Sequence, residues 1–185
     1  LSNTALTHAL VIGGEALQAS SISRWVSSGE VNIVNEYGPT ETVVGCCIFE
    51  TKSPLNGLVP IGKPIEGMRM YVLDSNLQLL PPGIAGDLYI GGLGLARGYL
   101  ARPVQTALSF IPDPFCQHEG HSGARLYKTG DRARYLPNGN LVFLGRKDQQ
   151  IKLNGYRIEL GEIEAALSQV SGVKEVAVML REDRT

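Results

Sequence analysis

The chain has 185 residues, of which 43% are hydrophobic and 19% are charged, as is typical of one globular domain or of one domain and a fragment. Seventeen basic and eighteen acidic residues leave a net charge of -1, which argues against nucleic acid or an anionic membrane surface as a partner. The sequence contains no apolar run of the roughly 18 residues that cross a bilayer, and residues 1–14 lack the charged n-region of a signal peptide, so we expect a cytoplasmic protein with reduced cysteines.

The first third of the chain predicts a strand, a helix and a second strand. Residues 8–14 form a buried strand that ends in glycines, residues 15–28 a helix, and residues 31–34 the second strand. The helix places four apolar side chains on one face: Leu17, Ile22, Trp25 and Val26. This order is typical of a parallel sheet, in which ligands bind beyond the carboxyl ends of the strands. We therefore expect a pocket between the glycines after the first strand and residues 35–42 (NEYGPTET) after the second.

Residues 54–146 have a different pattern, with short apolar segments separated by Pro, Gly and Asn turns. Alternation in several segments predicts an antiparallel, barrel-like region. Residues 112–123 have no periodicity and predict a surface loop. His118 and His121 in this loop have the spacing H-x-x-H, but no further patterned ligand accompanies them, so we expect no metal site there.

The glycine cluster at residues 91–98 (GGLGLARG) invites comparison with a dinucleotide-binding loop. The G-x-G-x-x-G spacing fails, because Arg97 stands where the third glycine belongs, and no obvious helix begins there. A glycine-rich strand and bulge is the favoured interpretation.

The last part of the chain predicts the beginning of a small α+β domain. Residues 149–160 (QQIKLNGYRIEL) indicate two strands around an Asn154-Gly155 turn, the strongest short hairpin signal. A helix follows, with Ile163, Leu167 and Val170 spaced by four and three residues, and then a strand over residues 173–180. The fold class is mixed α/β, with the end of a parallel α/β sheet in residues 1–50, a barrel-like subdomain in residues 51–147, and a hinge with the small domain in residues 148–185.

Four segments, in order, carry a resemblance to a known family. Taken alone, residues 35–41 are equally compatible with a polar turn, and the single acid of KTGD more often caps backbone amides than binds a ribose diol. Together, NEYGPTE, GDLYIGGLGLARGYL, YKTGD and GRKDQQIKLNGYRIELGEIE resemble consecutive core motifs of the adenylation domains of nonribosomal peptide synthetases. Acyl-CoA synthetases and luciferases are relatives that usually carry proline where this chain has Leu160, which favours amino-acid activation.

The resemblance implies an enzyme that makes an aminoacyl adenylate from ATP with Mg²⁺, releases pyrophosphate, and loads the aminoacyl group onto the phosphopantetheine of a carrier protein domain. Neighbouring synthetase domains are the other implied partners. Such chemistry needs positioned donors, a metal ligand and ring platforms. By motif match, Tyr37 stacks on the adenine, Thr40 meets the α-phosphate, and Glu41 binds Mg²⁺. The remaining implied nucleotide contacts are Gly14 and Glu15 on the other adenine wall, Asp131 on the ribose hydroxyls, and Arg146 on the ribose or phosphate side.

The resemblance also implies a hinge and a pantetheine tunnel. Asp148 marks the point about which the small C-terminal domain rotates between adenylation and thioester formation, and hinges use few residues with large dihedral changes. The alternative for Asp148 is an ordinary linker residue. The loop at residues 154–157 would line the tunnel, although family members often carry arginine where this chain has Asn154.

The implied amino-acid pocket is formed by Val11, Gly13, Glu36, Val44 and Gly45, which resemble the second half of pockets that select asparagine. Glu36 could accept a hydrogen bond from a side-chain amide, with the two glycines leaving room for it, whereas a buried carboxylate without a partner would be costly. A phenolic hydroxyl could also satisfy Glu36, so tyrosine is the rival substrate. Aspartate should be repelled as a like charge.

The family's phosphate loop, its aspartate for the substrate α-amino group and its catalytic lysine match no motif of the chain. We therefore expect residues 1–147 to be the C-terminal portion of a larger core domain, and the isolated chain to be inactive. Two alternatives stay open at this point. One is a non-catalytic nucleotide-binding or assembly module, and the other is an acyl-CoA synthetase relative, which Leu160 and Glu36 disfavour.

Overall fold

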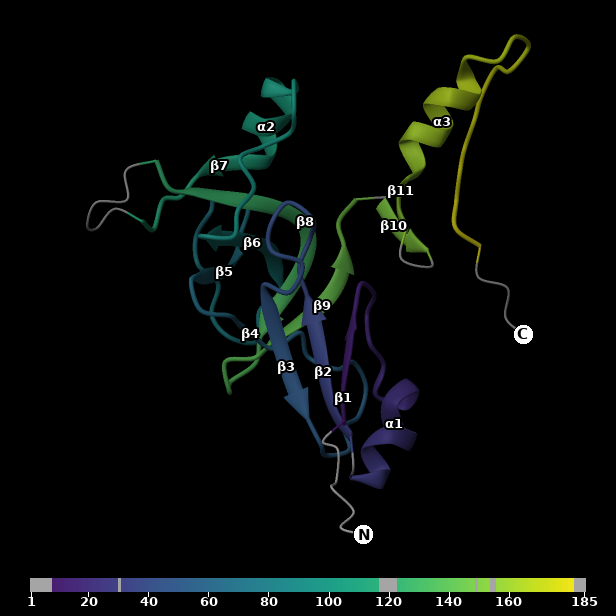
Figure 1. Cartoon of the computed structure of the whole chain (residues 1–185). Coiled ribbons are helices and arrows are strands. Elements are labelled where there is room, and N and C mark those ends of the chain that lie inside the picture. Colours follow the sequence, from purple (N-terminus) through teal and green to yellow (C-terminus); the bar gives the residue numbers. More distant parts are fainter. Residues whose placement is uncertain (1–7, 30, 117–122, 149, 154–155, 182–185) are drawn as a thin grey trace. The chain divides into compact units, whose positions relative to one another are not determined.

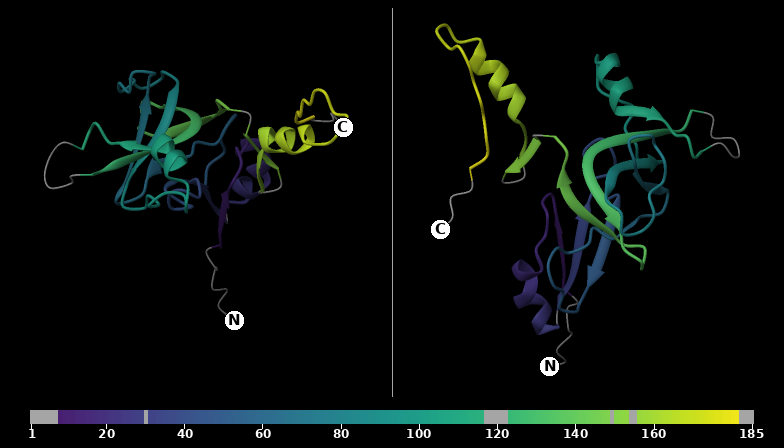
Figure 2. Two further views of the ribbon diagram at one scale, coloured as in Figure 1. Left: turned by 90° about the horizontal axis from the view of Figure 1, so that it is seen from above. Right: turned by 180° about the vertical axis from the view of Figure 1, so that it is seen from behind.

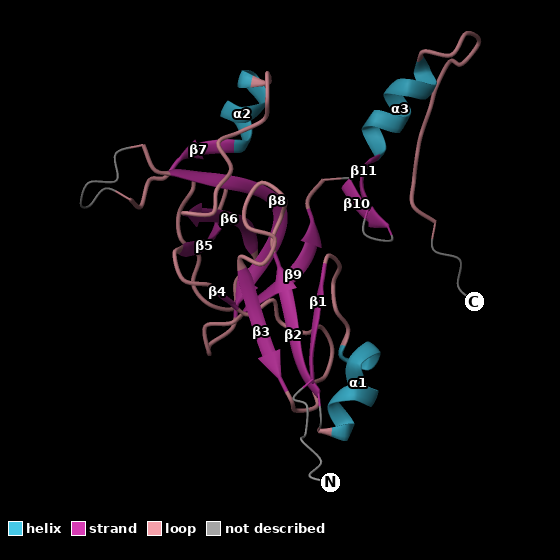
Figure 3. Cartoon of the chain, in the orientation of Figure 1, coloured by secondary structure: helices cyan, strands magenta, loops and turns pink. Residues whose placement is uncertain are grey.

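The computed structural model describes residues 8–29, 31–116, 123–148, 150–153 and 156–181. The chain forms two compact units, a large unit up to Gly145 and a small unit from Arg146. Strands dominate the large unit (Figure 3). The predicted mixed α/β class is confirmed.

The first sheet of the large unit contains the parallel pair that the sequence predicts. Strand β1 (His8–Gly13) pairs in parallel with β2 (Val31–Tyr37), and β3 (Cys47–Thr51) and the short β4 (Lys63–Pro64) continue the sheet antiparallel, in the order β1-β2-β3-β4 (Figure 1). The sheet is therefore mixed, and its parallel part ends at the segment with the NEYGPTET motif.

Helix α1 (Ala19–Ser28) connects the two parallel strands and packs against the sheet. Its buried face consists of Ala19, Ile22 and Val26, which share a core with Ile33 and Val59. The helix begins four residues later than predicted, so Leu17 precedes it, and Trp25 of the predicted apolar face is 50% exposed. At 100° per residue, Ile22 and Val26 point the same way while Trp25 falls on the edge of that stripe. Gly29 ends the helix in the left-handed conformation, with φ 68°.

The second sheet confirms the predicted antiparallel region. It contains β5 (Met68–Leu73), β6 (Gly86–Gly92), β7 (Phe110–Pro112), β8 (Arg125–Tyr135) and β9 (Leu141–Arg146), in the order β5-β6-β8-β7, with β9 also paired to β8. The long β8 is strongly curved (Figure 2), so the sheet forms a curled half-barrel. The glycine cluster ends β6 and continues into a turn, and the irregular pairing of β6 with β8 lies nearer Asp87.

Alternating side chains of these strands form the largest core cluster. Met70, Val72, Leu88, Ile90, Ala133 and Leu141 are all buried within it. The same cluster includes Cys46 and Cys47, so both cysteines pack as small apolar residues. Their burial confirms the prediction that they act as packing residues.

The helices of the described residues are short, and none is long and apolar enough to cross a membrane. Helix α2 (Pro103–Ser109) begins with proline at its first turn and buries none of its residues. Helix α3 (Leu160–Ser168) belongs to the small unit and buries only Leu160.

In the small unit, β10 (Gln150–Leu153) and β11 (Tyr156–Glu159) form the predicted hairpin, with Leu153 opposite Tyr156. Its turn residues, Asn154 and Gly155, lie outside the described residues. The strand predicted over residues 173–180 does not form. A strand needs a neighbour to receive its hydrogen bonds, and no described segment pairs with this one. The Val178 N–H instead donates to the Glu164 carboxylate at 2.9 Å.

Candidate functional site

The loop after β2 is folded tightly by its own residues. Gly38 is required there, because a Cβ would lie 2.3 Å from the carbonyl oxygens of Val43 and Val44. The hydroxyl of Thr42 and its backbone N–H each donate to the Pro39 carbonyl, both at 3.0 Å. This turn leaves Thr40 exposed and buries Glu41, which is 7% exposed.

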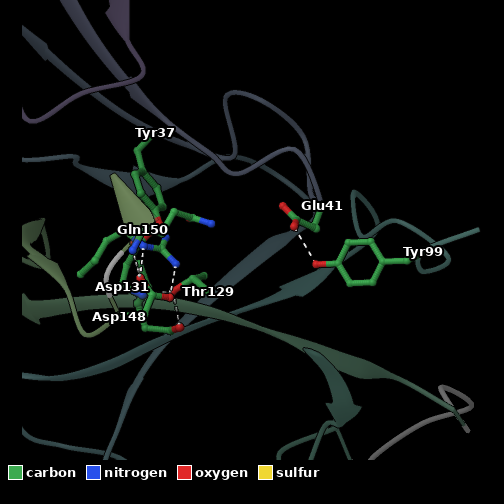
Figure 4. A network of polar contacts seen from close by, with 9 residues as sticks. Tyr37, Glu41, Tyr99, Thr129, Asp131, Asp148 and Gln150 are labelled. Carbon is green, nitrogen blue, oxygen red and sulfur yellow. Dashed lines mark hydrogen bonds and ion pairs between the residues drawn. The ribbon is translucent and has the colours of Figure 1, made fainter. Parts of the chain in front are cut away.

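The first cluster joins the end of β2 to β8. The Tyr37 hydroxyl donates a hydrogen bond to the Asp131 carboxylate, although 94 residues separate the two in sequence (Figure 4). Burial, and then the negative charge of Asp131, raises the pKa of Tyr37 well above its ordinary value. The phenol therefore stays protonated and remains a donor at physiological pH. No pattern in the sequence indicates that these two predicted residues touch.

Thr129 anchors the backbone of Asp131. Its hydroxyl accepts the Asp131 N–H at 2.9 Å and donates to the Leu88 carbonyl on β6 at 2.7 Å. Gly130 between them has φ 77°, a conformation that favours glycine. The KTGD motif is thus an irregular stretch within β8, where the pairing with β6 shifts register between Lys128 and Arg132, and it presents one acid, with Thr129 as a supporting residue that sequence reasoning missed.

The second cluster surrounds Glu41. The Tyr99 hydroxyl donates to the Glu41 carboxylate at 2.7 Å (Figure 4), and the Ala96 N–H donates to the Glu41 carbonyl at 2.8 Å. Thr106 in α2 accepts the Tyr99 N–H at 2.9 Å. Burial, and then the bond to Glu41, raises the pKa of Tyr99 above its ordinary value. Tyr99 stands in the ARGYL segment that carried the resemblance, yet nothing in that pattern marked it as a partner of Glu41.

The segment around Tyr99 is itself well anchored. The Arg125 guanidinium donates to the carbonyls of Arg97 at 2.9 Å and Ala96 at 3.1 Å, and it lies 5.1 Å from the ring centre of Phe110. Tyr99 meets the same ring edge-on, with 5.8 Å between ring centres. Glu41 therefore contacts a segment between β6 and α2 that is anchored to the second sheet through Arg125 and Phe110.

The predicted amino-acid pocket lies on one face of the first sheet. Register pairs Gly13 with Glu36 and Val11 with Val34, so Val11, Gly13 and Glu36 face the same side. A Cβ on Gly45 would lie 1.9 Å from a carboxylate oxygen of Glu36, and one on Gly13 would lie 2.9 Å from the Glu36 carbonyl. Both glycines therefore make room for Glu36 itself. The side chains of Val11 and Val44 are exposed.

Four other predicted residues lie either directly after β1 or in the small unit. Gly14 (φ 97°) and Glu15 follow β1 and are exposed at the sheet edge where β2 also ends. In the small unit, the Arg146 guanidinium donates to both carboxylate oxygens of Asp148, at 2.6 Å each. This is the bidentate geometry typical of strong arginine–carboxylate pairs.

The titratable groups restrict the chemistry of the large unit. Burial raises the pKa of Cys46 to about 11 and that of Cys47 further still, so neither thiol is an activated nucleophile. No cluster of three metal-ligating side chains occurs among the described residues. Glu41 contributes one carboxylate, which suits Mg²⁺ because this ion typically binds one or two carboxylates together with substrate phosphates.

Comparison with known proteins identifies the family. The family model described as "AMP-binding enzyme" matches residues 2–100, which is more than half of the chain. The chain belongs to the AMP-binding enzyme family.

Within the AMP-binding enzymes, the chain is similar to adenylation domains of nonribosomal peptide synthetases. It is 46% identical over 175 residues to a dimodular nonribosomal peptide synthase of Bacillus subtilis (strain 168), covering 95% of this chain and 7% of that protein. PA1221, an NRPS protein containing adenylation and PCP domains, superposes with a TM-score of 0.85 at 35% identity, covering 95% of this chain and 36% of that one. The Vibrio cholerae adenylation domain AlmE, solved with glycyl-adenosine-5'-phosphate, has a TM-score of 0.76 at 30% identity, with coverages of 89% and 31%.

These matches confirm the resemblance that the four motifs carried. The chain corresponds to part of an adenylation domain, and it spans about a third of the two solved structures.

Proposed function

We propose that the chain supplies the nucleotide site and half of the amino-acid pocket of an adenylation domain that forms an aminoacyl adenylate from ATP. The observation that carries the proposal is the meeting of Tyr37 with Asp131, which brings two separate motif residues into one buried contact. An aromatic ring beside a carboxylate provides a platform for a base and an acceptor for ribose hydroxyls. The adenylate bound by AlmE supports this assignment.

The nucleotide contacts follow from these positions. Tyr37 stacks on the adenine, and Gly14 and Glu15 line the opposite wall at the ends of the two parallel strands. Asp131 accepts hydrogen bonds from the ribose hydroxyls. Arg146 completes the contacts on the ribose or phosphate side.

The reacting end of ATP lies toward the loop after β2. Thr40 is exposed there and donates to the α-phosphate, while Glu41 holds Mg²⁺, which neutralises phosphate charge when bound. Tyr99 keeps the Glu41 carboxylate in one orientation. Because the chemistry consists of positioning and charge neutralisation, these residues need not act as acids or bases.

Asparagine is the amino acid that the pocket residues favour. The Glu36 carboxylate accepts a hydrogen bond from the side-chain amide, and it can do so only in the place that Gly45 leaves open. Tyrosine is the rival substrate, since a phenolic hydroxyl is also a donor. Aspartate is rejected by like charge.

The later steps involve the small unit. We infer that Asp148 is the hinge between a core portion, residues 1–147, and a small C-terminal domain beginning in residues 148–185, and that the aminoacyl group passes to the phosphopantetheine of a carrier domain. PA1221, which combines adenylation and PCP domains, supports a carrier partner, and the dimodular synthase of Bacillus subtilis supports neighbouring synthetase domains. A cytoplasmic location belongs to the same proposal.

We further propose that the chain is part of a longer protein, here named the parent protein, and that the 185 residues alone form no adenylate. The direct test is amino-acid-dependent exchange of pyrophosphate into ATP. Exchange by the parent protein and none by the chain alone is the expected result. Exchange by the isolated chain would refute the second statement, and coenzyme A turnover with a fatty acid would favour the acyl-CoA synthetase alternative.

A further inference from the structure

The contact between Tyr37 and Asp131 lies in the protein interior. Tyr37 is 9% exposed and Asp131 is 6% exposed, so the carboxylate lies where few water molecules can solvate it. A buried carboxylate requires hydrogen bonds from the protein. The Tyr37 hydroxyl provides one of them directly to the side chain.

Thr129 supports Asp131 in a different way, through the backbone. Its hydroxyl accepts the Asp131 N–H, which fixes the backbone of this stretch of β8 but leaves the terminal torsion of the side chain broad. The Tyr37 ring, in contrast, is a rigid platform that packs beside Phe143, with 6.2 Å between ring centres. The backbone carbonyl of Tyr37 accepts the Cys46 thiol at 3.3 Å. Contacts at its ring and at its backbone therefore both position the Tyr37 residue that carries this donor.

We propose that Tyr37 is a positioning residue for ribose recognition, because its hydroxyl orients the Asp131 carboxylate toward the sugar hydroxyls. This inference rests on the proposed function, in which the ring face of Tyr37 meets the adenine. An ionised carboxylate offers about four acceptor sites, so accepting the phenol is compatible with accepting hydroxyls as well. One side chain thereby couples recognition of the base to recognition of the sugar.

The variant Tyr37→Phe separates the two roles, because it keeps the ring and removes only the hydroxyl. The measurement is the affinity of the parent protein for AMP and for 2′-deoxy-AMP by isothermal titration calorimetry. We expect Tyr37→Phe to weaken AMP about tenfold and 2′-deoxy-AMP less than about threefold, so that discrimination between the sugars collapses. Loss of the same factor for both nucleotides, or no loss, would overturn the inference.

A second pair of variants keeps the test valid if the loss of the phenol donor to a buried carboxylate destabilises Tyr37→Phe. Asp131→Ala removes the carboxylate and with it every acceptor of that side chain, and Tyr37→Phe is then added to it. We expect the added substitution to change AMP affinity by less than about twofold, because the carboxylate that the hydroxyl positions is already gone. A further tenfold loss would show that the hydroxyl contacts the nucleotide itself and would refute the positioning role.

The results that would refute the proposed function differ from those that would refute this inference. An unaltered parent protein that does not bind AMP would refute nucleotide binding altogether. Equal affinity of the unaltered protein for AMP and 2′-deoxy-AMP would remove the ribose role of Asp131, and with it the inference. Clear discrimination by the unaltered protein that persists in Tyr37→Phe would overturn only the positioning role.

Discussion

Gly45→Ala is the substitution whose effect the structure specifies most closely. A Cβ at this position would lie 1.9 Å from a Glu36 carboxylate oxygen and 2.5 Å from its Cδ, whereas ordinary contacts begin at 3.4 Å. The Glu36 carboxylate must therefore leave its place. Gly45 has no positive φ, so the backbone itself accepts alanine.

The cost to stability is small because the obstacle is the end of a flexible side chain. Moving Glu36 to a strained rotamer costs about 0.5–1.5 kcal/mol. Replacing glycine with alanine stabilises the fold by about 0.4–1 kcal/mol, because it lowers the conformational entropy of the unfolded chain. The loss of the Glu36 hydrogen bond to substrate is worth about 1.5–3 kcal/mol, or roughly 10- to 100-fold in kcat/KM for asparagine. The KM for ATP should not change.

The assay is pyrophosphate exchange by the parent protein with asparagine at varied concentration, together with thermal unfolding. Gly161→Ala is the matched control, since its Cβ would meet nothing within 4 Å. Asparagine use like that of the unaltered protein, or a uniform loss for every amino acid with a lowered Tm, would refute the assignment of Glu36 to the pocket.

Three further predictions concern other parts of the structure. Tyr99→Phe removes the donor to Glu41 and should raise the Mg²⁺ concentration for half-maximal exchange about tenfold; an unchanged Mg²⁺ dependence would contradict this. Because burial raises the pKa of Cys46 to about 11, its thiol is protonated at pH 8, so peptide mapping after iodoacetamide treatment should find the partly exposed Cys116 modified first, not Cys46. Leu126→Ala, at a fully buried position, should destabilise the fold by about 2–5 kcal/mol, while Leu93→Ala, 89% exposed, should leave the Tm within about a degree or two.

Local patterns in the sequence were sufficient for much of the fold. The parallel pair of strands and the hairpin were predicted from apolar runs and turn residues that lie within a few positions of each other. The strand over residues 173–180 failed because alternation describes a strand that has a partner, and no described segment pairs with it. Apolar spacing also placed Trp25 on the same face as Ile22 and Val26, but it did not show that Trp25, at the edge of that stripe, is half exposed.

In the candidate site, too, the sequence indicated individual residues but not the contacts between residues that are far apart along the chain. Motif order located Tyr37, Glu41 and Asp131, but not the contacts between them and other residues. The bonds from Tyr37 to Asp131 and from Tyr99 to Glu41 span 94 and 58 residues, and they depend on how two sheets fold in space. Sequence reasoning also attributed the space at Gly45 to substrate, whereas Glu36 lies against that glycine.

The most direct test of amino-acid activation is ATP–pyrophosphate exchange by the parent protein, measured across the proteinogenic amino acids with AMP binding as a check on folding. We predict exchange that depends on the amino acid and is greatest with asparagine. Exchange led by another amino acid would reject the pocket assignment while keeping the enzyme class. A folded, AMP-binding protein that shows no exchange with any of them would contradict the proposed activation of proteinogenic amino acids.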